Sequence, residues 1–120
     1  MRLRNIPGAD EAIADSPHCI QEPMAEKGRW HLIFGNENPI HIEIGMGKGQ
    51  FIMKLAKEHP DINYIGIERY SSVLLRALQK MEIEPLPNIR FLCMDASIIT
   101  EVFDKEEVAK IYLNFSDPWP

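Results

Sequence analysis

The sequence predicts an α/β fold in which a parallel β-sheet is covered by helices on both faces. Apolar runs of strand length begin at Ile40, Asn63, Ile89 and Ala109, and helical apolar spacing follows the first three runs. Prolines, glycines and asparagines separate these segments. Strands that alternate with helices form parallel sheets with right-handed crossovers.

The chain divides into two parts. Residues 1–36 contain prolines and glycines throughout and show no sustained period, so we expect a mostly irregular N-terminal arm with a turn of helix near 10–14. The apolar patch at 30–34 is expected to lie on the main body. Residues 37–120 are expected to form the N-terminal half of the α/β domain.

The periodic region gives the elements in order. Strands are predicted at 40–44, 63–68, 89–94 and 109–115, and helices at 50–58, 71–81 and 97–103. The inward face of the first helix is assigned to Phe51, Ile52, Leu55 and Ala56. The fourth strand is nearly continuously apolar, which is typical of a parallel strand covered on both faces.

The sequence ends where a fifth element is expected. Strand 109–115 would have an unpaired edge, and an apolar edge strand promotes aggregation. We therefore expect these 120 residues to be the first half of a larger domain in which only the first four strands are present. A small sheet of four parallel strands is the alternative.

Composition and charge narrow the class of protein. The chain is 45% hydrophobic and 26% charged, with no apolar run long enough to span a membrane and no signal-peptide core, so we expect a cytoplasmic protein. The net charge of −5 argues by itself against a nucleic-acid-binding protein. Cys19 and Cys93 are isolated in sequence, and Cys93 is expected to be a core residue.

The glycine-rich turn after the first strand reads Glu43-Ile44-Gly45-Met46-Gly47-Lys48-Gly49. Neither the phosphate-binding G-x-x-x-x-G-K-[ST] pattern nor the dinucleotide G-x-G-x-x-G pattern fits, because Gly49 and Gln50 occupy the discriminating positions. Glu43 would repel a pyrophosphate but suits a ligand with a positive end, such as S-adenosylmethionine. Alternatively, the glycines only turn the chain.

Two further carboxylates follow the next strands. Glu68 ends the second strand, 23 positions after Gly45, where it can accept hydrogen bonds from ribose hydroxyls or pair with Arg69. Asp95 ends the third strand, where it can accept the exocyclic amine of an adenine or cap the helix that begins near Ser97. Ligands of open α/β sheets bind beyond the carboxyl ends of strands, so the grouping favours a ligand site.

The last residues, Asp117-Pro118-Trp119-Pro120, follow the fourth strand at the same end of the sheet. Each proline holds the residue before it in an extended conformation, so the loop is stiff. Asp117 is placed to contact a base edge, and Trp119 either stacks on a base or anchors the strand end.

The sequence contains no pattern typical of a metal site or of a hydrolase active site. His18, His31, His41 and His59 share no metal-ligand spacing, and no nucleophile elbow is present. We therefore assign no metal ligands.

Three motifs together resemble the bacterial tRNA (guanine-N7-)-methyltransferase family. They are His41-Ile42-Glu43-Ile44-Gly45-Met46-Gly47-Lys48-Gly49-Gln50-Phe51, Gly66-Ile67-Glu68 and Asn114-Phe115-Ser116-Asp117-Pro118-Trp119-Pro120. The opening Met1-Arg2-Leu3-Arg4-Asn5 and the turn Phe34-Gly35-Asn36 are also similar to that family, which usually has lysine and tryptophan at the positions of Ile6 and Gly8.

The resemblance implies a Rossmann-like class I methyltransferase fold. It implies methyl transfer from S-adenosylmethionine to N7 of a guanine in the tRNA variable loop. By this resemblance the cofactor site contains Glu43, Gly45, Gly47, Glu68, Asp95 and Asp117, and Asp117 also belongs to the catalytic centre. The family continues beyond the last residue with a basic segment that contacts tRNA, which would account for the negative charge.

Two other functions remain open. An Asp followed by Pro and an aromatic residue also resembles the active-site loop of methyltransferases that act on exocyclic amines. A non-catalytic nucleotide-binding module is the alternative from a different class.

Overall fold

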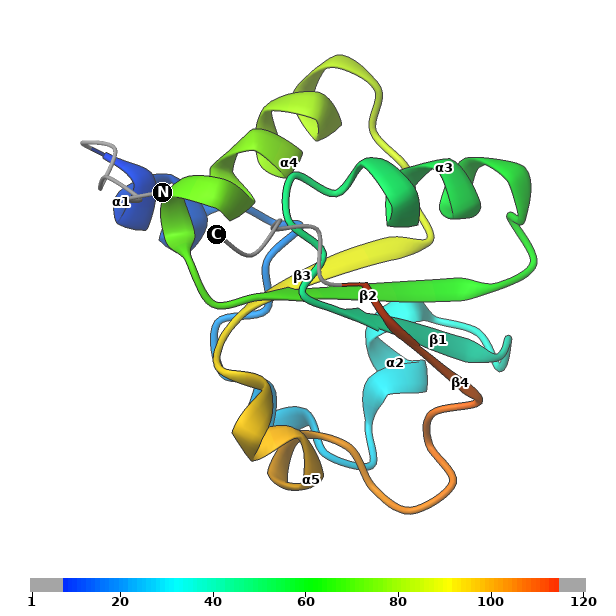
Figure 1. Ribbon diagram of the computed structural model, residues 1–120. Coiled ribbons are helices and arrows are strands. Elements are labelled where there is room, and N and C mark those ends of the chain that lie inside the picture. Colours follow the sequence, from blue (N-terminus) through cyan, green and yellow to red (C-terminus); the bar gives the residue numbers. More distant parts are fainter. Residues whose placement is uncertain (1–7, 115–120) are drawn as a thin grey trace.

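The computed structural model describes residues 8–114 and shows one parallel sheet with the strand order β3-β2-β1-β4 (Figure 1). The strands are β1 (Ile40–Ile44), β2 (Asn63–Glu68), β3 (Ile89–Cys93) and β4 (Lys110–Leu113). The first two strands have the predicted bounds, and the last two are shorter than predicted. The prediction of a parallel sheet covered on both faces is confirmed.

The upper face of the sheet in Figure 1 is covered by α3 (Gln50–Glu58) and α4 (Ser71–Ile83). Both helices lie where the apolar spacing predicts them. Their buried faces form one core with the sheet: Ile52, Met53, Ala56, Leu74, Ala77, Leu78 and Met81 pack against Tyr64, Ile89 and Phe91. The predicted inward face of α3 is wrong at Phe51, which is exposed, while Met53 is buried.

The opposite face is covered by α2 (Trp30–Phe34), the 3-10 helix η2 (Ala96–Ile98) and α5 (Ile99–Val102). Trp30 is completely buried there, and its ring packs at 5.2 Å from that of Phe103. The indole Nε1 donates to the carbonyl of Val102 at 2.8 Å. The apolar patch at 30–34 therefore lies on the main body, as predicted.

The N-terminal segment is more regular than predicted. The predicted turn of helix near 10–14 is confirmed by α1 (Ala9–Asp15). The 3-10 helix η1 (Pro23–Glu26) and α2 add helical turns that were not predicted, so a mostly irregular arm is wrong for the described residues 8–36. The Phe91 N–H donates to His18, and the Phe91 carbonyl accepts from Ile20. These contacts cover the outer edge of β3, and they depend on residues far apart in sequence, which local patterns do not report.

The opposite edge of the sheet, formed by β4, is more exposed than predicted. Ile111 and Leu113 of β4 are 52% and 65% exposed, so this strand is not covered on both faces within the described residues. Cys93 is exposed at the end of β3, and the prediction of a core cysteine is wrong. An apolar run predicts a strand, but it does not predict which neighbours cover it.

Candidate cofactor site

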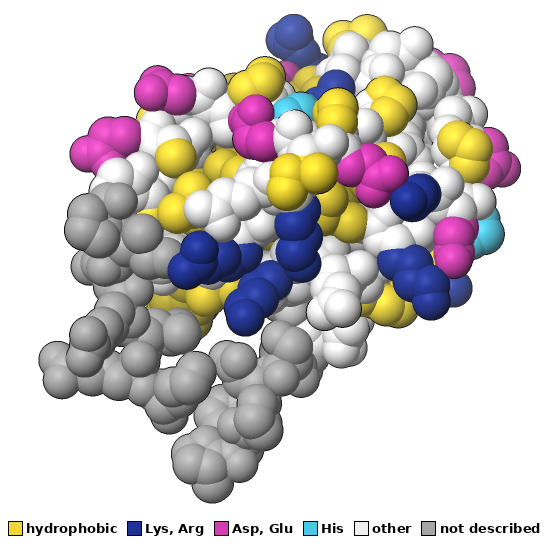
Figure 2. All heavy atoms as spheres, turned by 90° about the horizontal axis from the view of Figure 1, so that it is seen from above, with side chains coloured by type: hydrophobic (Ala, Val, Ile, Leu, Met, Phe, Trp, Pro, Cys, Tyr) yellow, Lys and Arg dark blue, Asp and Glu magenta, His cyan; other side chains and the backbone are white. Residues whose placement is uncertain are grey.

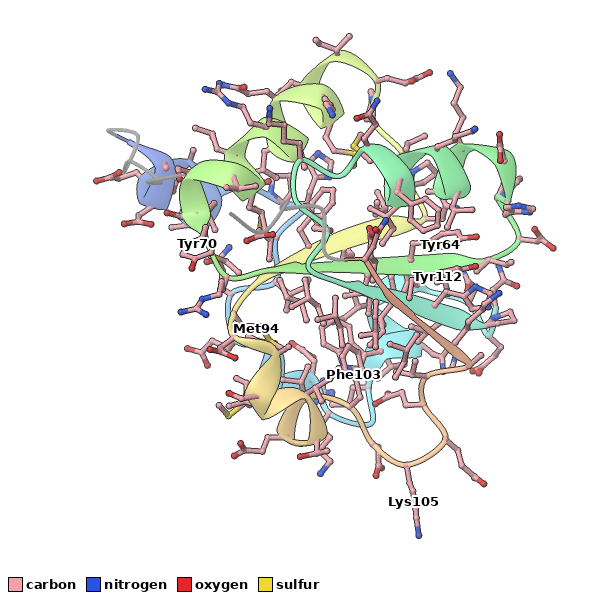
Figure 3. All side chains as sticks on the ribbon, in the orientation of Figure 1. Tyr64, Tyr70, Met94, Phe103, Lys105 and Tyr112 are labelled. Carbon is pink, nitrogen blue, oxygen red and sulfur yellow. The ribbon has the colours of Figure 1, made fainter. Side chains whose placement is uncertain are left out.

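The site is built on the sheet face below α3 and α4. Glu43 of β1 lies in register with Gly66 of β2 on one side and with Tyr112 of β4 on the other. Figure 3 shows Tyr64 and Tyr112 on the same side of the sheet, toward α3. Since side chains alternate along a strand, Glu68, two residues after Gly66, faces the same way.

The glycine turn connects β1 to α3 in a left-handed backbone conformation. Gly45, Gly47 and Gly49 have φ angles of 76°, 60° and 80°, which side chains rarely tolerate. The carbonyl of Ile67 accepts hydrogen bonds from the N–H groups of Gly45 and Met46, at 2.9 and 3.1 Å. The turn is therefore fixed against the end of β2.

Gly49 serves a second purpose at the start of α3. A Cβ atom there would lie 3.0 Å from the Cβ of Ala77 on α4. The small residues let the first turn of α3 approach α4 closely, which brings the glycine turn over the sheet.

Met46 anchors the turn in the core. Its side chain is buried and occupies the space that a side chain at Gly66 would need, since a Cβ there would lie 2.3 Å from the Met46 sulfur. Sequence analysis did not identify this contact, because the residues are 20 positions apart. The sequence signal for this contact is Gly66 itself, because a glycine inside a strand of bulky residues often marks a place where another part of the chain approaches closely.

Glu68 is buried at the end of β2 and binds the turn directly. Its Oε1 accepts from the Gly47 N–H at 3.0 Å, and its Oε2 accepts from the Tyr70 N–H at 3.1 Å. No ion pair joins it to Arg69 within the described part of the chain, where the Arg69 guanidinium lies over the Tyr70 ring. The surface ion-pair alternative is therefore wrong.

Glu43 is buried more completely, with 1% of its surface exposed. Within residues 8–114 its Oε1 has no hydrogen-bond partner. Burial raises the pKa of the Glu43 carboxyl to about 7, and a hydrogen bond with the Asn114 side chain opposes the rise. A buried carboxylate oxygen without a donor is costly, so Oε1 marks a place where a cation or donor is favoured.

Asp95 lies exposed after β3 and caps η2. Its Oδ1 accepts from the Ser97 N–H at 2.9 Å, and this hydrogen bond lowers the pKa of the carboxyl. The capping role is therefore present, and the contact with an adenine remains a prediction. Asp117 and Trp119, which we also predicted for the site, lie outside the described residues.

Residues 8–114 contain no group of three or more His, Cys, Asp or Glu residues arranged to hold a metal ion. In the same range, every helix is too short or too polar to cross a membrane.

Comparison with known proteins identifies the family. Residues 37–120 match the sequence profile of a family described as "Putative methyltransferase". The chain belongs to this methyltransferase family. The matched region begins just before β1 and includes the glycine turn and all four strands.

Relatives within the methyltransferases are similar over the whole chain. The tRNA (guanine-N(7)-)-methyltransferase of Lachnoclostridium phytofermentans is 62% identical over 120 residues, which are 100% of this chain and 56% of that protein. The enzyme of the same name from Brevibacillus brevis is 54% identical with the same coverage. The chain thus spans about 56% of the length of these curated relatives.

The fold also matches that of a solved methyltransferase. An antibiotic-related methyltransferase is 28% identical with a TM-score of 0.63, covering 78% of this chain and 47% of that one. The predicted Rossmann-like methyltransferase fold is confirmed by this similarity together with the sheet order.

Proposed function

We propose that the protein containing this chain transfers a methyl group from S-adenosylmethionine to N7 of a guanine in the tRNA variable loop. The observation that carries the proposal is the 62% identity over the whole chain to a relative named for this reaction. The glutamates around the glycine turn support the cofactor, and we keep the prediction of a cytoplasmic enzyme.

The residues present fit S-adenosylmethionine. The buried Oε1 of Glu43 lacks a partner within residues 8–114, and it suits the positive end of this ligand better than a phosphate. When bound, S-adenosylmethionine supplies the methyl group on a cationic sulfonium. We assign its positive end to Glu43, its ribose hydroxyls to Glu68 and its adenine amine to Asp95.

The backbone of the glycine turn supports the same assignment. Gly45 and Gly47 carry no side chains that could obstruct a ligand, and Glu68 holds Gly47 in position. Because both oxygens of Glu68 accept from backbone N–H groups, the carboxylate is oriented before the ligand arrives. Each oxygen retains a second lone pair for a ribose hydroxyl.

Methylation at N7 requires little acid–base catalysis by the protein. Guanine N7 has an in-plane lone pair and no proton at neutral pH, so the reaction depends chiefly on alignment with the methyl group. The product base becomes positively charged. We assign Asp117 either to stabilising that charge or to holding the N–H edge of the guanine.

The test uses the intact protein with methyl-labelled S-adenosylmethionine and tRNA transcripts. We expect label in 7-methylguanosine from the variable loop, identified after nuclease digestion. A transcript made with 7-deazaguanosine lacks the accepting nitrogen and is expected to remain unlabelled. Label on the 7-deaza transcript would instead indicate an exocyclic-amine methyltransferase, and tRNA binding without any transfer would indicate a non-catalytic module.

A further inference from the structure

Three cationic residues belong to the glycine turn and to α4, on the face of the sheet covered by α3 and α4 (Figure 1). Lys80 of α4 donates from its Nζ to the carbonyl of Lys48 in the turn, at 3.2 Å. Arg76 lies one helical turn before Lys80 on α4 and is exposed. Figure 2 shows Lys and Arg side chains gathered together on this face. We refer to Lys48, Arg76 and Lys80 as the basic cluster.

The basic cluster has no acidic partners in the described part of the chain. The ion pairs within 4.0 Å there are Arg29 with Glu26, His31 with Glu37 and Lys57 with Glu84. Arg76 donates to the neutral Oε1 of Gln79 at 3.1 Å. Within residues 8–114 the charges of Lys48, Arg76 and Lys80 are therefore not paired with a carboxylate.

The position of the basic cluster connects it to the candidate cofactor site. Lys48 directly follows Gly47, whose N–H donates to Glu68. A polyanion bound across α4 and the turn would therefore lie next to the bound cofactor. In a chain with a net charge of −5, such a local basic area attracts an anionic partner to one place.

We infer that the basic cluster binds the phosphodiester backbone of the RNA substrate. This inference rests on the proposed function, because it names a substrate contact for the same site. Lys48 and Arg76 are exposed, so a polyanion can reach both residues, whereas small ligands are usually held in concave sites. Contacts of this kind position a nucleic acid without reading its sequence, which suits an enzyme that must orient one base.

The experiment measures binding of a tRNA transcript to the intact protein at about 50 to 200 mM salt. The test variant is Arg76→Gln/Lys80→Gln. The control variant, Lys27→Gln/Lys105→Gln, makes the same change in net charge away from the cluster. Both control lysines are exposed, and Figure 3 shows Lys105 on the opposite side of the sheet. Fluorescence anisotropy gives the Kd at each salt concentration.

The test variant is expected to bind tRNA about tenfold more weakly at low salt. Its plot of log Kd against log salt is expected to be less steep by about 1 to 2, since up to two phosphate contacts are lost. The control is expected to bind as the parent does. The Kd for S-adenosylmethionine is expected to stay unchanged, and the KM for tRNA to rise with little change in kcat.

Three results would overturn the inference. The first is an unchanged Kd for tRNA and an unchanged salt slope in the test variant. The second is an equal loss of tRNA affinity in the control variant. The third is a loss of tRNA affinity in the test variant but none in the single variant Arg76→Gln, which leaves the Lys80 contact with the turn intact. Because binding needs no methyl transfer, the two proposals are distinguishable. A parent that binds tRNA through the cluster but never methylates N7 would refute only the proposed function.

If the unsubstituted protein methylates N7 and the test variant binds tRNA normally, only the role of the basic cluster is refuted. Binding of an acidic protein is the competing use of these cations. It predicts unchanged tRNA binding in the test variant and therefore also counts against the inference.

Discussion

Glu43 and Glu68 are two buried carboxylates on one face of the sheet with different surroundings. Both oxygens of Glu68 accept hydrogen bonds from backbone N–H groups. Glu43 lies one strand away, and its Oε1 has no partner within residues 8–114. The Glu68 carboxylate is thus fixed by the backbone, whereas the Oε1 of Glu43 is left to be satisfied by protonation or by a ligand.

The titration of Glu43 gives a prediction for stability. Burial raises the pKa of its carboxyl from 4.5 to about 7, so the folded state retains a proton that the unfolded state releases between those values. The unfolding free energy is therefore expected to fall as pH rises through this window, by at most about 3 kcal/mol. Urea denaturation of the parent and of Glu43→Gln measures it, because the variant lacks this titration. Parallel pH profiles would contradict the prediction.

The same titration affects ligand binding. An ionised Glu43 attracts the positive end of S-adenosylmethionine, so the affinity is expected to rise several-fold as pH rises through about 7. Calorimetry on the intact protein measures this rise, which Glu43→Gln is expected to lack. An affinity that does not change with pH in the parent would remove Glu43 from the site.

Replacing Glu68 tests the ribose assignment. Glu68→Ala is expected to weaken S-adenosylmethionine binding by about 1 to 3 kcal/mol, because charge-assisted hydrogen bonds are lost. Calorimetry measures the affinity, and Glu101→Ala on the exposed surface of α5 is the control. An unchanged affinity in a folded Glu68→Ala protein would exclude Glu68 from the site.

At the scale of elements, the position of the glycine turn depends on a fit between β1, α3 and β2. Met46 fills the space above Gly66, and Gly49 lets α3 approach Ala77 of α4. The first contact joins the glycine turn to β2, and the second joins the N-terminus of α3 to α4. The turn is therefore held by packing as well as by its backbone hydrogen bonds.

Gly66→Ala tests this fit. The new Cβ would lie 2.3 Å from the Met46 sulfur and 3.2 Å from Phe91 Cδ1, so overpacking is expected to cost about 1 to 3 kcal/mol of stability. In a Met46→Ala background only the Phe91 contact obstructs the new Cβ, and the same change is expected to cost at least about 0.5 kcal/mol less. Denaturation of the four proteins gives the coupling energy. Equal costs in both backgrounds would contradict the contact.

At the scale of the whole molecule, the two edges of the sheet differ. Residues 18–20 pair with β3 through hydrogen bonds at Phe91. Within residues 8–114, β4 has a strand neighbour on one side only, and Leu113 is 65% exposed. An exposed apolar edge strand is a template for pairing with another chain.

A polypeptide of these 120 residues is therefore expected to self-associate through β4. Leu113→Lys is expected to reduce the association, because a charge on an edge strand opposes pairing. Sedimentation velocity measures it. Leu32→Lys is the matched control, since Leu32 is 73% exposed but lies on α2. An equal effect of both substitutions would indicate general solubility instead of edge pairing.

The elements around the site could be predicted from the sequence with little error. β1, α3 and β2 lie at the predicted residues because their signals are local: apolar runs, helical spacing and a glycine turn. The carboxylates at strand ends could be predicted for the same reason. Whether Asp95 caps a helix or faces a ligand could not, since both uses give the same local pattern.

The sequence by itself determined the fold class, the order of the elements and the residues at the carboxyl ends of the strands. Only the tertiary structure decided that Glu43 has a buried oxygen without a partner in residues 8–114, that Glu68 binds Gly47, and that Lys80 reaches Lys48. These facts depend on contacts between residues distant in the chain. Backbone hydrogen bonding and apolar period are local properties, whereas burial and charge environment come from packing.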